Sequence, residues 1–420
     1  MENRLFRNEL LYFSWDTFCH VMRMTIKLKE DIDGKILNDA VQSASDRYPY
    51  FGIKVLKHDE DYDIVHNDMP VVVKNGLEAI ALGSEEANFH FWAVSYDGCK
   101  IVCDISHNLT DGYGLTELCK TIVYLYLKKK TGLDLAGDNI RIPGSDYLPN
   151  EEVDPYSLLD LENADKPLSQ IKYATAFTPD KRYATDEGRM NYLMRASVKD
   201  TMRVAKAQDG SPAVVLAYFV KEAIKRLFPD RQGKTIVCGI PHSFRHMADL
   251  KHNSFNDSVV LSLVYDDRIE AMDTDKQFTC SRGRISLQTD PDNLLYTLHN
   301  RAEFAASLDE LPTIEARRQA CKDSVEVIIK NPETAAVSYV GQTKWGSIEE
   351  YMDTISLHCG ALSAPVLIEV LTLNGWFYMT MMLNQTSEEY AKTIVEILNE
   401  NGISSEYLTS FDNTLCTFRF

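Results

Sequence analysis

Near the start of the chain, the spacing of hydrophobic and polar positions changes from that of a strand to that of a helix and back to that of a strand. Residues 20–28 alternate between apolar and polar side chains, which predicts a β-strand. Asp33 is placed to cap a helix that Pro49 terminates, and residues 50–55 fit a second strand. The inward face of this helix is predicted to consist of Leu37, Ala40, Val41, Ala44 and Tyr48. The opening of the chain therefore predicts a strand, a helix and a strand.

A second group of predicted elements surrounds His107. Residues 89–94 are aromatic and rich in β-formers, and Asp97-Gly98 is a strong hairpin signal. Residues 100–106 then fit the return strand, so that His107 lies at its end. Beyond it, apolar residues recur at helical spacing, at Leu115, Leu118, Ile122 and Leu125. A strand, a histidine loop and an amphipathic helix can together place a base at the mouth of a cleft.

A long segment without periodicity separates two structured regions. Residues 138–166 are rich in proline, glycine and acids, which predicts a loop that wraps the surface. Regular structure resumes with the strand pattern of residues 191–196. We therefore expect two subdomains, residues 1–175 and residues 176–420.

The second region again mixes helices and hairpins. Ser197 and Ser211-Pro212 are placed to begin helices, and Asn374-Gly375 is the turn of a clear hairpin. Further strands are expected over residues 235–240, 259–265 and 414–420, and a further helix over residues 387–401. Neither Gly-x-Gly-x-x-Gly nor Gly-x-x-x-x-Gly-Lys occurs. The pattern favours an α+β fold over a parallel nucleotide-binding sheet.

Composition narrows the class of protein. With 420 residues, 45% hydrophobic and 25% charged, the chain is long enough for two packed domains. No signal-peptide pattern and no run of about 18 apolar residues is present, so no membrane span is expected. Nine cysteines without Cys-x-x-Cys spacing suit a reducing cytoplasm. The net charge of −18 disfavours nucleic acid as a partner, but it allows a phosphate-bearing thioester at a local basic patch.

The candidate chemistry lies in the run His107-x-x-x-Asp111-Gly112. From 10 His, 62 acids and 20 Gly in 420 residues, a His-x-x-x-acid-Gly run should arise by chance about 0.07 times. Such an arrangement can hold one imidazole as a general base, with the carboxylate fixing the loop. A single histidine at a strand end is more often a structural hydrogen-bonding group, but the motif and its flanking elements favour the catalytic interpretation.

In these residues the chain resembles the superfamily of chloramphenicol acetyltransferase, the condensation domains of nonribosomal peptide synthetases, and the alcohol and polyketide-associated acyltransferases. Their shared signature is His-x-x-x-Asp-Gly, usually preceded by a second histidine. This chain has Ser106 in that preceding place, and the superfamily's catalytic histidine matches His107. The absence of a histidine at position 106 argues against membership in the branch of the superfamily that forms peptide bonds. Weaker similarities lie at Arg47-Tyr48-Pro49, residues 240–245, Asn256 and residues 337–341.

The resemblance implies a fold and a reaction. The fold would be two chloramphenicol-acetyltransferase-like subdomains, each a mixed sheet with helices on one side, that form a pseudo-dimer around a central channel. The reaction would be acyl transfer from a thioester to a hydroxyl or amine, with acyl-CoA or an acyl carrier protein as co-substrate and no tightly bound cofactor. Both substrates would be small molecules unless a carrier protein delivers the donor, and the chain is expected to be a monomer in the cytoplasm.

The resemblance also implies roles for single residues. His107 would take the proton of the acceptor, Asp111 would fix the loop by pairing with an arginine, and Gly112 would permit a tight turn and a close backbone approach. Arg245, Asn256 and Ser338 are candidates for the polar lining of the channel, with Ser338 donating toward the developing oxyanion.

Alternatives stay open for several of these residues and for the protein. Arg245 is as well explained by an interdomain ion pair, and Ser338 by an ordinary strand position. His242, His246 and His252 mimic metal spacing, but no carboxylate or cysteine completes a set, so no metal is expected. A noncatalytic binding relative and a condensation-type enzyme that uses carrier-bound substrates are the other function classes.

Overall fold

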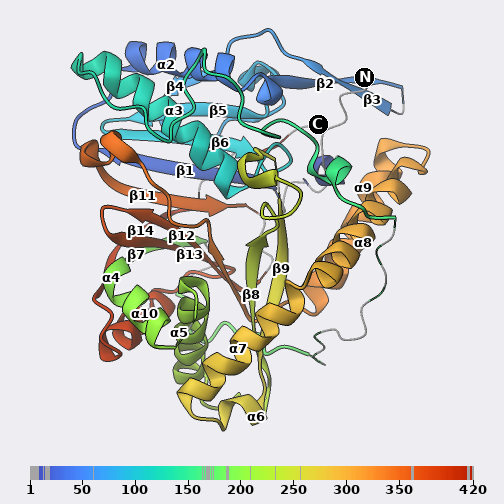
Figure 1. Ribbon diagram of the computed structural model, residues 1–420, viewed down its shortest axis with the longest axis vertical. Helices are drawn as coiled ribbons and strands as arrows, with labels where there is room; N and C mark the ends of the chain where they lie inside the picture. The colour runs from blue at the N-terminus through green and yellow to red at the C-terminus, as the bar shows by residue number, and fades with distance from the viewer. Residues whose placement is uncertain are drawn as a thin grey trace.

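Two β-sheets face each other across the middle of the molecule, and helices cover the outer face of each (Figure 1). The α+β architecture with mixed sheets is therefore confirmed. The computed structural model describes residues 9–418 except residues 13, 15–18, 60, 163, 165, 167–170, 172, 174, 186–188, 209, 232, 256, 361–363 and 414–416.

The first sheet combines strands from both halves of the chain. Among the described residues its strand order is β11-β1-β6-β5-β4. These strands are β11 (Met352–Cys359), β1 (Val21–Leu28), β6 (Lys100–Ser106), β5 (Trp92–Asp97) and β4 (Val73–Asn75). Helices α2 (Gly34–Arg47) and α3 (Gly112–Thr131) cover it. Because β11 comes from the second half, that half completes the first sheet, and a division near residue 175 stays a prediction.

The second sheet consists of strands that follow residue 189. Among the described residues its order is β14-β7-β13-β12-β10-β8-β9. The strands are β14 (Ser405–Asp412), β7 (Met190–Ser197), β13 (Trp376–Leu383), β12 (Val366–Leu373), β10 (Ala335–Tyr339), β8 (Ile236–Ser243) and β9 (Ser258–Tyr265). Strand β10 runs parallel to both β8 and β12, whereas the other pairs are antiparallel. Its outer face is covered by α4 (Val198–Ala207), α5 (Pro212–Leu227) and α10 (Glu389–Glu400).

A series of helices runs along one side of the molecule, drawn yellow to orange in Figure 1. They are α6 (Asp267–Glu270), α7 (Thr274–Gln288), α8 (Pro291–Asp309) and α9 (Ile314–Lys330). Helix α1 (Glu9–Tyr12) packs near α9, and β2 (Ile53–His58) pairs with β3 (Asp61–His66) in a separate hairpin. The sequence did not predict α6 to α9, because apolar residues recur only weakly at helical spacing within them.

Local signals in the sequence predicted element ends well. The Asp33 carboxylate accepts hydrogen bonds from the first backbone N–H groups of α2, and the Ser211 hydroxyl does the same for α5. The turns at Asp97-Gly98 and Asn374-Gly375 join paired antiparallel strands as expected. Strand β14, which ends at Asp412, was not predicted, because its sequence is polar and one of its sides is exposed at the sheet edge. Much of the predicted strand 414–420 lies outside the described residues.

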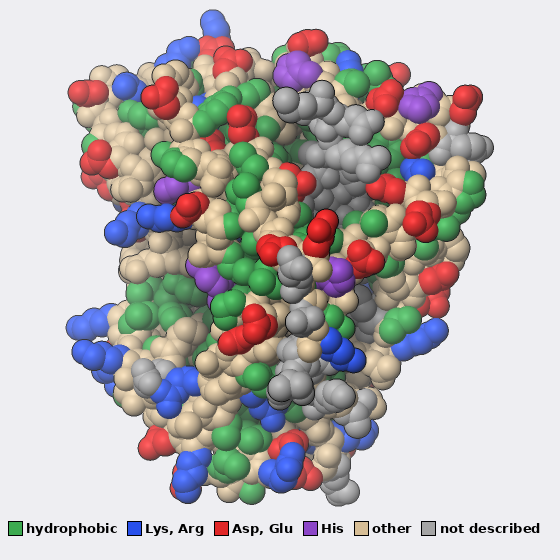
Figure 2. All heavy atoms as spheres, turned by 45° about the vertical axis from the view of Figure 1, so that its right-hand side comes forward, with side chains coloured by type: hydrophobic (Ala, Val, Ile, Leu, Met, Phe, Trp, Pro, Cys, Tyr) green, Lys and Arg blue, Asp and Glu red, His purple; other side chains and the backbone are tan. Residues whose placement is uncertain are grey.

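The surface in Figure 2 mixes acidic and basic side chains, with hydrophobic side chains scattered between them. The described residues drawn there form no continuous basic surface of the kind that binds nucleic acid. Within the described part of the chain, every helix is too short or too polar to cross a membrane.

Candidate active site

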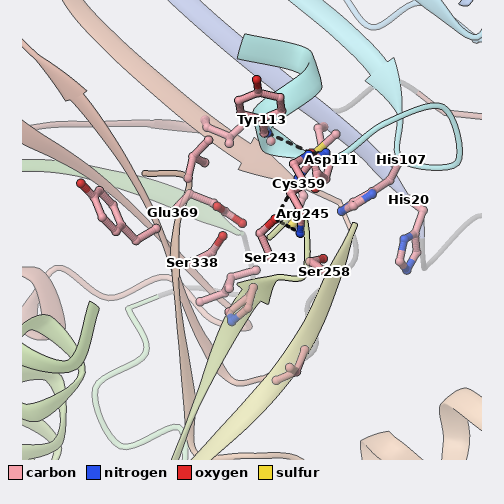
Figure 3. A pocket seen from close by; sticks show the side chains of 18 of the residues that line it. His20, His107, Asp111, Tyr113, Ser243, Arg245, Ser258, Ser338, Cys359 and Glu369 are labelled. Carbon is pink, nitrogen blue, oxygen red and sulfur yellow. Dashed lines mark hydrogen bonds and ion pairs between the residues drawn. The ribbon is translucent and has the colours of Figure 1, made fainter. Parts of the chain in front are cut away.

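His107 leaves the end of β6 where the chain turns toward α3. Its backbone N–H donates to the carbonyl of His20 at 2.7 Å, which continues the pairing of β6 with β1. The N–H of Leu109 donates to the carbonyl of Ser106 at 3.0 Å and closes a tight turn. The His107 side chain is half-buried, and its ring centroid lies 5.7 Å from that of His20. The strand pairing and the turn thus fix the direction of the imidazole, which points into a cavity (Figure 3).

Asp111 caps α3 and at the same time binds Arg245 of the second half. Its Oδ1 accepts from the backbone N–H groups of Tyr113 at 3.0 Å and Gly114 at 3.3 Å. Arg245 donates from Nη1 to Oδ2 at 2.7 Å and from Nη2 to Oδ1 at 2.9 Å. Both side chains are about nine-tenths buried. One carboxylate therefore links the start of the helix behind His107 to the second half.

The charge state of this pair follows from its surroundings. Burial alone would raise the pKa of Asp111, but the charge and hydrogen bonds of Arg245 hold that pKa below its ordinary value of 3.8. A second acid, Asp257, has its Oδ2 3.8 Å from Nε of Arg245, and burial raises the pKa of Asp257 to about 8. At neutral pH, Arg245 therefore faces an ionised Asp111 and a largely protonated Asp257.

Ser254 of the second half binds to the loop around the motif, and its neighbours Asn253 and Phe255 bind Arg245. The hydroxyl of Thr110 donates to the carbonyl of Ser254 at 2.6 Å. Arg245 donates from Nε to the carbonyl of Asn253 at 2.9 Å and from Nη2 to the carbonyl of Phe255 at 2.5 Å. Each of these donors or acceptors is buried, so the hydrogen bonds are protected from competing water. The loop that carries His107 is therefore held from two sides.

Two glycines at the start of α3 allow Val340, Thr110 and the backbone of Ser254 to lie close to the helix. A Cβ at Gly112 would lie 2.8 Å from Cγ2 of Val340, and a Cβ at Gly114 would collide with Thr110 and the backbone carbonyl of Ser254. The atoms close to Gly112 are side-chain atoms of Val340 and Leu357, so the close backbone approach expected there stays a prediction. The tight turn expected at Gly112 is not present, because Gly112 is the first residue of α3 and its φ lies outside the left-handed region.

His107 and Arg245 line a cavity of about 320 Å³ between the two sheets (Figure 3). This volume suits a small ligand or part of a larger one. The first half contributes residues of β1 and the start of α3, and the second half contributes residues of β8, β9, β10, β11, β12 and α8. The polar or ionisable side chains in its wall include His20, Tyr113, Ser243, Ser258, Arg301, Ser338, Tyr339, Cys359 and Glu369.

The structure brings most of the predicted site residues together. His107, Asp111, Gly112, Arg245 and Ser338 all line the cavity. Arg245 is engaged with Asp111, and the Ser338 hydroxyl is hydrogen-bonded to the carboxyl group of Glu369. Asn256, the remaining predicted channel residue, lies outside the described residues. Among the described residues, no group of three or more His, Cys, Asp or Glu side chains could hold a metal ion.

Sequence reasoning missed several ionisable groups in the wall of the cavity, among them His20 and Glu369. His20 directly precedes β1 and brings a second imidazole beside His107. Glu369 lies in the middle of β12, where burial raises its pKa to about 7 and the hydrogen bond from Ser338 partly opposes that shift. An acid that interrupts the apolar run of residues 366–371 was a signal for such a site, since a buried strand rarely carries an uncompensated carboxyl group.

Comparison of the sequence with protein-family models and with curated proteins found no match. Among solved structures, the chain is similar to polyketide synthase associated protein 5 from Mycobacterium tuberculosis, with a TM-score of 0.58, 13% identity, and coverage of 94% of this chain and 96% of that one. TRI101 of F. sporotrichioides, complexed with coenzyme A and T-2, gives a TM-score of 0.58 at 9% identity. The match covers 95% of this chain and 98% of that one.

The condensation domain of the Monacolin K polyketide synthase MokA gives a TM-score of 0.56 at 12% identity, over 93% of this chain and 94% of that one. The chain has the condensation-domain and acetyltransferase fold. Identity this low shows the fold alone, and the likeness spans nearly the whole chain, so it includes both sheets. The pseudo-dimer of two chloramphenicol-acetyltransferase-like subdomains expected from the sequence is thereby confirmed as the architecture.

Proposed function

We propose that the protein is an acyltransferase that moves an acyl group from a thioester donor, acyl-CoA or a carrier thioester, to a hydroxyl or amine acceptor. The observation that carries this proposal is the position of His107. Its imidazole enters the cavity from a strand end, and the Asp111–Arg245 pair fixes the loop behind it. A positioned imidazole in an enclosed site is well suited to proton transfer near neutral pH.

The reaction then needs only groups of this chain and the two substrates. His107 accepts the proton of the acceptor as its oxygen or nitrogen attacks the thioester carbonyl and forms a new bond to carbon. The tetrahedral intermediate collapses with cleavage of the carbon–sulfur bond, and the departing thiolate receives the proton from His107. Asp111 stays ionised and bound to Arg245 throughout, so its role is to position the base. Whether the Ser338 hydroxyl donates to the oxyanion stays a prediction, because that hydroxyl is hydrogen-bonded to Glu369.

Structural relatives support coenzyme A as the carrier of the donor. TRI101 is complexed with coenzyme A and T-2, and a mutant of the starter condensation domain of rhizomide synthetase RzmA is complexed with C8-CoA. The RzmA domain shares 12% identity with this chain at a TM-score of 0.58 and covers 95% of it. The condensation-type alternative is weaker, because Ser106 occupies the place of the usual first histidine. The second imidazole beside His107 is that of His20, which directly precedes β1.

The proposal is tested by measuring free thiol released from a panel of acyl-CoA thioesters, with and without alcohol and amine acceptors. We expect thiol release that rises with acceptor concentration, together with an acylated product identified by mass spectrometry. Release that does not depend on any acceptor would indicate a thioester hydrolase. Binding of thioesters without turnover, for the whole panel and for carrier-bound donors, would indicate a noncatalytic binding protein.

A further inference from the structure

The second sheet places a carboxyl group in the wall of the cavity, across from the His107 loop (Figure 3). Glu369 of β12 lies beside Ser338 of β10 in parallel register. Side chains on β12 alternate between faces: Ile368 and Val370 belong to the core under α5 and α10, whereas Leu367 and Glu369 line the cavity. The alternation of side chains along β12 therefore directs the Glu369 carboxyl group into the cavity.

The cationic side chains of the cavity wall already have partners. Arg245 binds Asp111 through two hydrogen bonds, and Nη1 of Arg301 donates to the carbonyl of Ser258 at 2.5 Å. Among the described residues, the hydroxyl of Ser338 is the polar group that contacts the Glu369 carboxyl. An ionised Glu369 therefore leaves a negative charge in the cavity that the described side chains do not neutralise.

We propose that Glu369, with Ser338, binds an ammonium group of the acyl acceptor, so that the acceptor is a cationic alcohol or amine. This inference rests on the proposed function. The ammonium must be separate from the nucleophile, because a protonated nitrogen has no lone pair with which to attack the thioester. The acceptor therefore carries two functional groups: one that His107 deprotonates and one that Glu369 holds.

One further feature of the chain suits a cation at this position. The net charge of −18 attracts cations to the molecule and raises their local concentration at a cleft. Charge-assisted hydrogen bonds to a buried carboxylate contribute roughly 1.5–3 kcal/mol, which corresponds to about 10- to 100-fold in affinity.

The experiment compares two alcohols of nearly equal shape. 3-Dimethylaminopropan-1-ol carries an ammonium at neutral pH, and 4-methylpentan-1-ol replaces the nitrogen by carbon. With the acyl-CoA that gives the highest turnover, we expect the wild type to prefer the cationic alcohol by about 10- to 100-fold in kcat/KM. In Glu369→Gln this preference should fall to near one, through a higher KM for the cationic alcohol with kcat largely retained.

Glu333→Gln is the matched control. Glu333 also accepts a hydrogen bond from a serine, Ser262, at 2.6 Å, and burial raises its pKa to about 6. It does not belong to the described residues that line the cavity. The preference for the cationic alcohol should therefore survive in this variant. A loss of preference equal to that of Glu369→Gln would show that the effect is a general response to removing a buried acid, and would overturn the inference.

Failure of the inference and failure of the proposed function give different results. If the wild type acylates both alcohols equally well, the enzyme is an acyltransferase but Glu369 does not select a cation. If no thioester is turned over, calorimetric binding of the two alcohols to the full chain still tests the site. Tighter binding of the cationic alcohol that is lost in Glu369→Gln would then support the cation site, and equal binding would overturn it.

Discussion

Replacing His107 by alanine should lower acyl transfer by about 10²- to 10⁴-fold, the range that positioned general-base catalysis typically contributes. The reason is that the motif, the strand end and the cavity all direct this imidazole toward the reacting atoms. The loss should appear in kcat, with little change in the KM of either substrate, because the side chain acts on a proton that moves in the transition state. Steady-state thiol release with the best thioester and acceptor measures it.

His20→Ala is the informative comparison for this prediction. His20 lines the same cavity, with its ring centroid 5.7 Å from that of His107, so both variants remove an imidazole from one site. We expect His20→Ala to lose much less activity. Circular dichroism and thermal unfolding should show that both variants remain folded. Retention of transfer within tenfold by His107→Ala, or a larger loss in His20→Ala, would reassign the base to another group.

Features that depend on neighbouring residues could be predicted from the sequence. Helix caps at Asp33 and Ser211 and the two Asx-Gly turns are local, since a side chain and the backbone within three residues decide them. The His107 motif is also local, because the strand, turn and first helical residues lie within a dozen positions. The α+β class followed from the same signals.

Features that depend on contacts between distant residues could not be predicted from the sequence. The partner of Asp111 is 134 residues away. The sequence singled out Arg245 as a channel residue or as a member of an interdomain ion pair, but no local signal linked it to Asp111. The placement of β11 in the first sheet depends on pairing between residues 22–28 and 352–359. The surface helices α7 to α9 have weak apolar periodicity, so their packing along the side of the molecule was not visible in the pattern.

Replacing Asp111 by asparagine should reduce both stability and rate. Asparagine caps helices about as well as aspartate, so the start of α3 should survive. The charge that balances Arg245 is lost, and removing one member of a buried ion pair typically costs about 3–5 kcal/mol in the free energy of unfolding. Asp257, whose Oδ2 is 3.8 Å from Nε of Arg245, can ionise in the variant and recover part of this loss. We therefore expect a loss of stability of about 3 kcal/mol, the lower end of that range, measured by denaturant unfolding.

A second buried pair provides the control for this variant. Arg23 donates from Nε to Oδ1 of Asp104 at 2.7 Å and from Nη2 to Oδ2 at 2.9 Å, with both side chains at least 95% buried. The pair joins β1 and β6 in the first sheet, outside the described residues that line the cavity. Asp104→Asn should therefore lose stability to a similar extent while its folded fraction keeps the wild-type rate. Asp111→Asn should lose rate as well, because the loop behind His107 loses its anchor.

The dependence of stability on pH separates an anchoring role for Asp111 from a direct role in proton transfer. Arg245 lowers the pKa of Asp111 in the folded protein below its ordinary value of 3.8. The stabilisation by this carboxylate is therefore fully present above about pH 4 and is lost as the pH falls through the lowered pKa. The difference in stability between wild type and Asp111→Asn should be largest near neutral pH and should shrink below pH 4. If stability were instead unchanged at every pH and the pH–rate profile shifted, Asp111 would be acting on the transferred proton itself, because an anchor that carries no folding energy could not hold the loop.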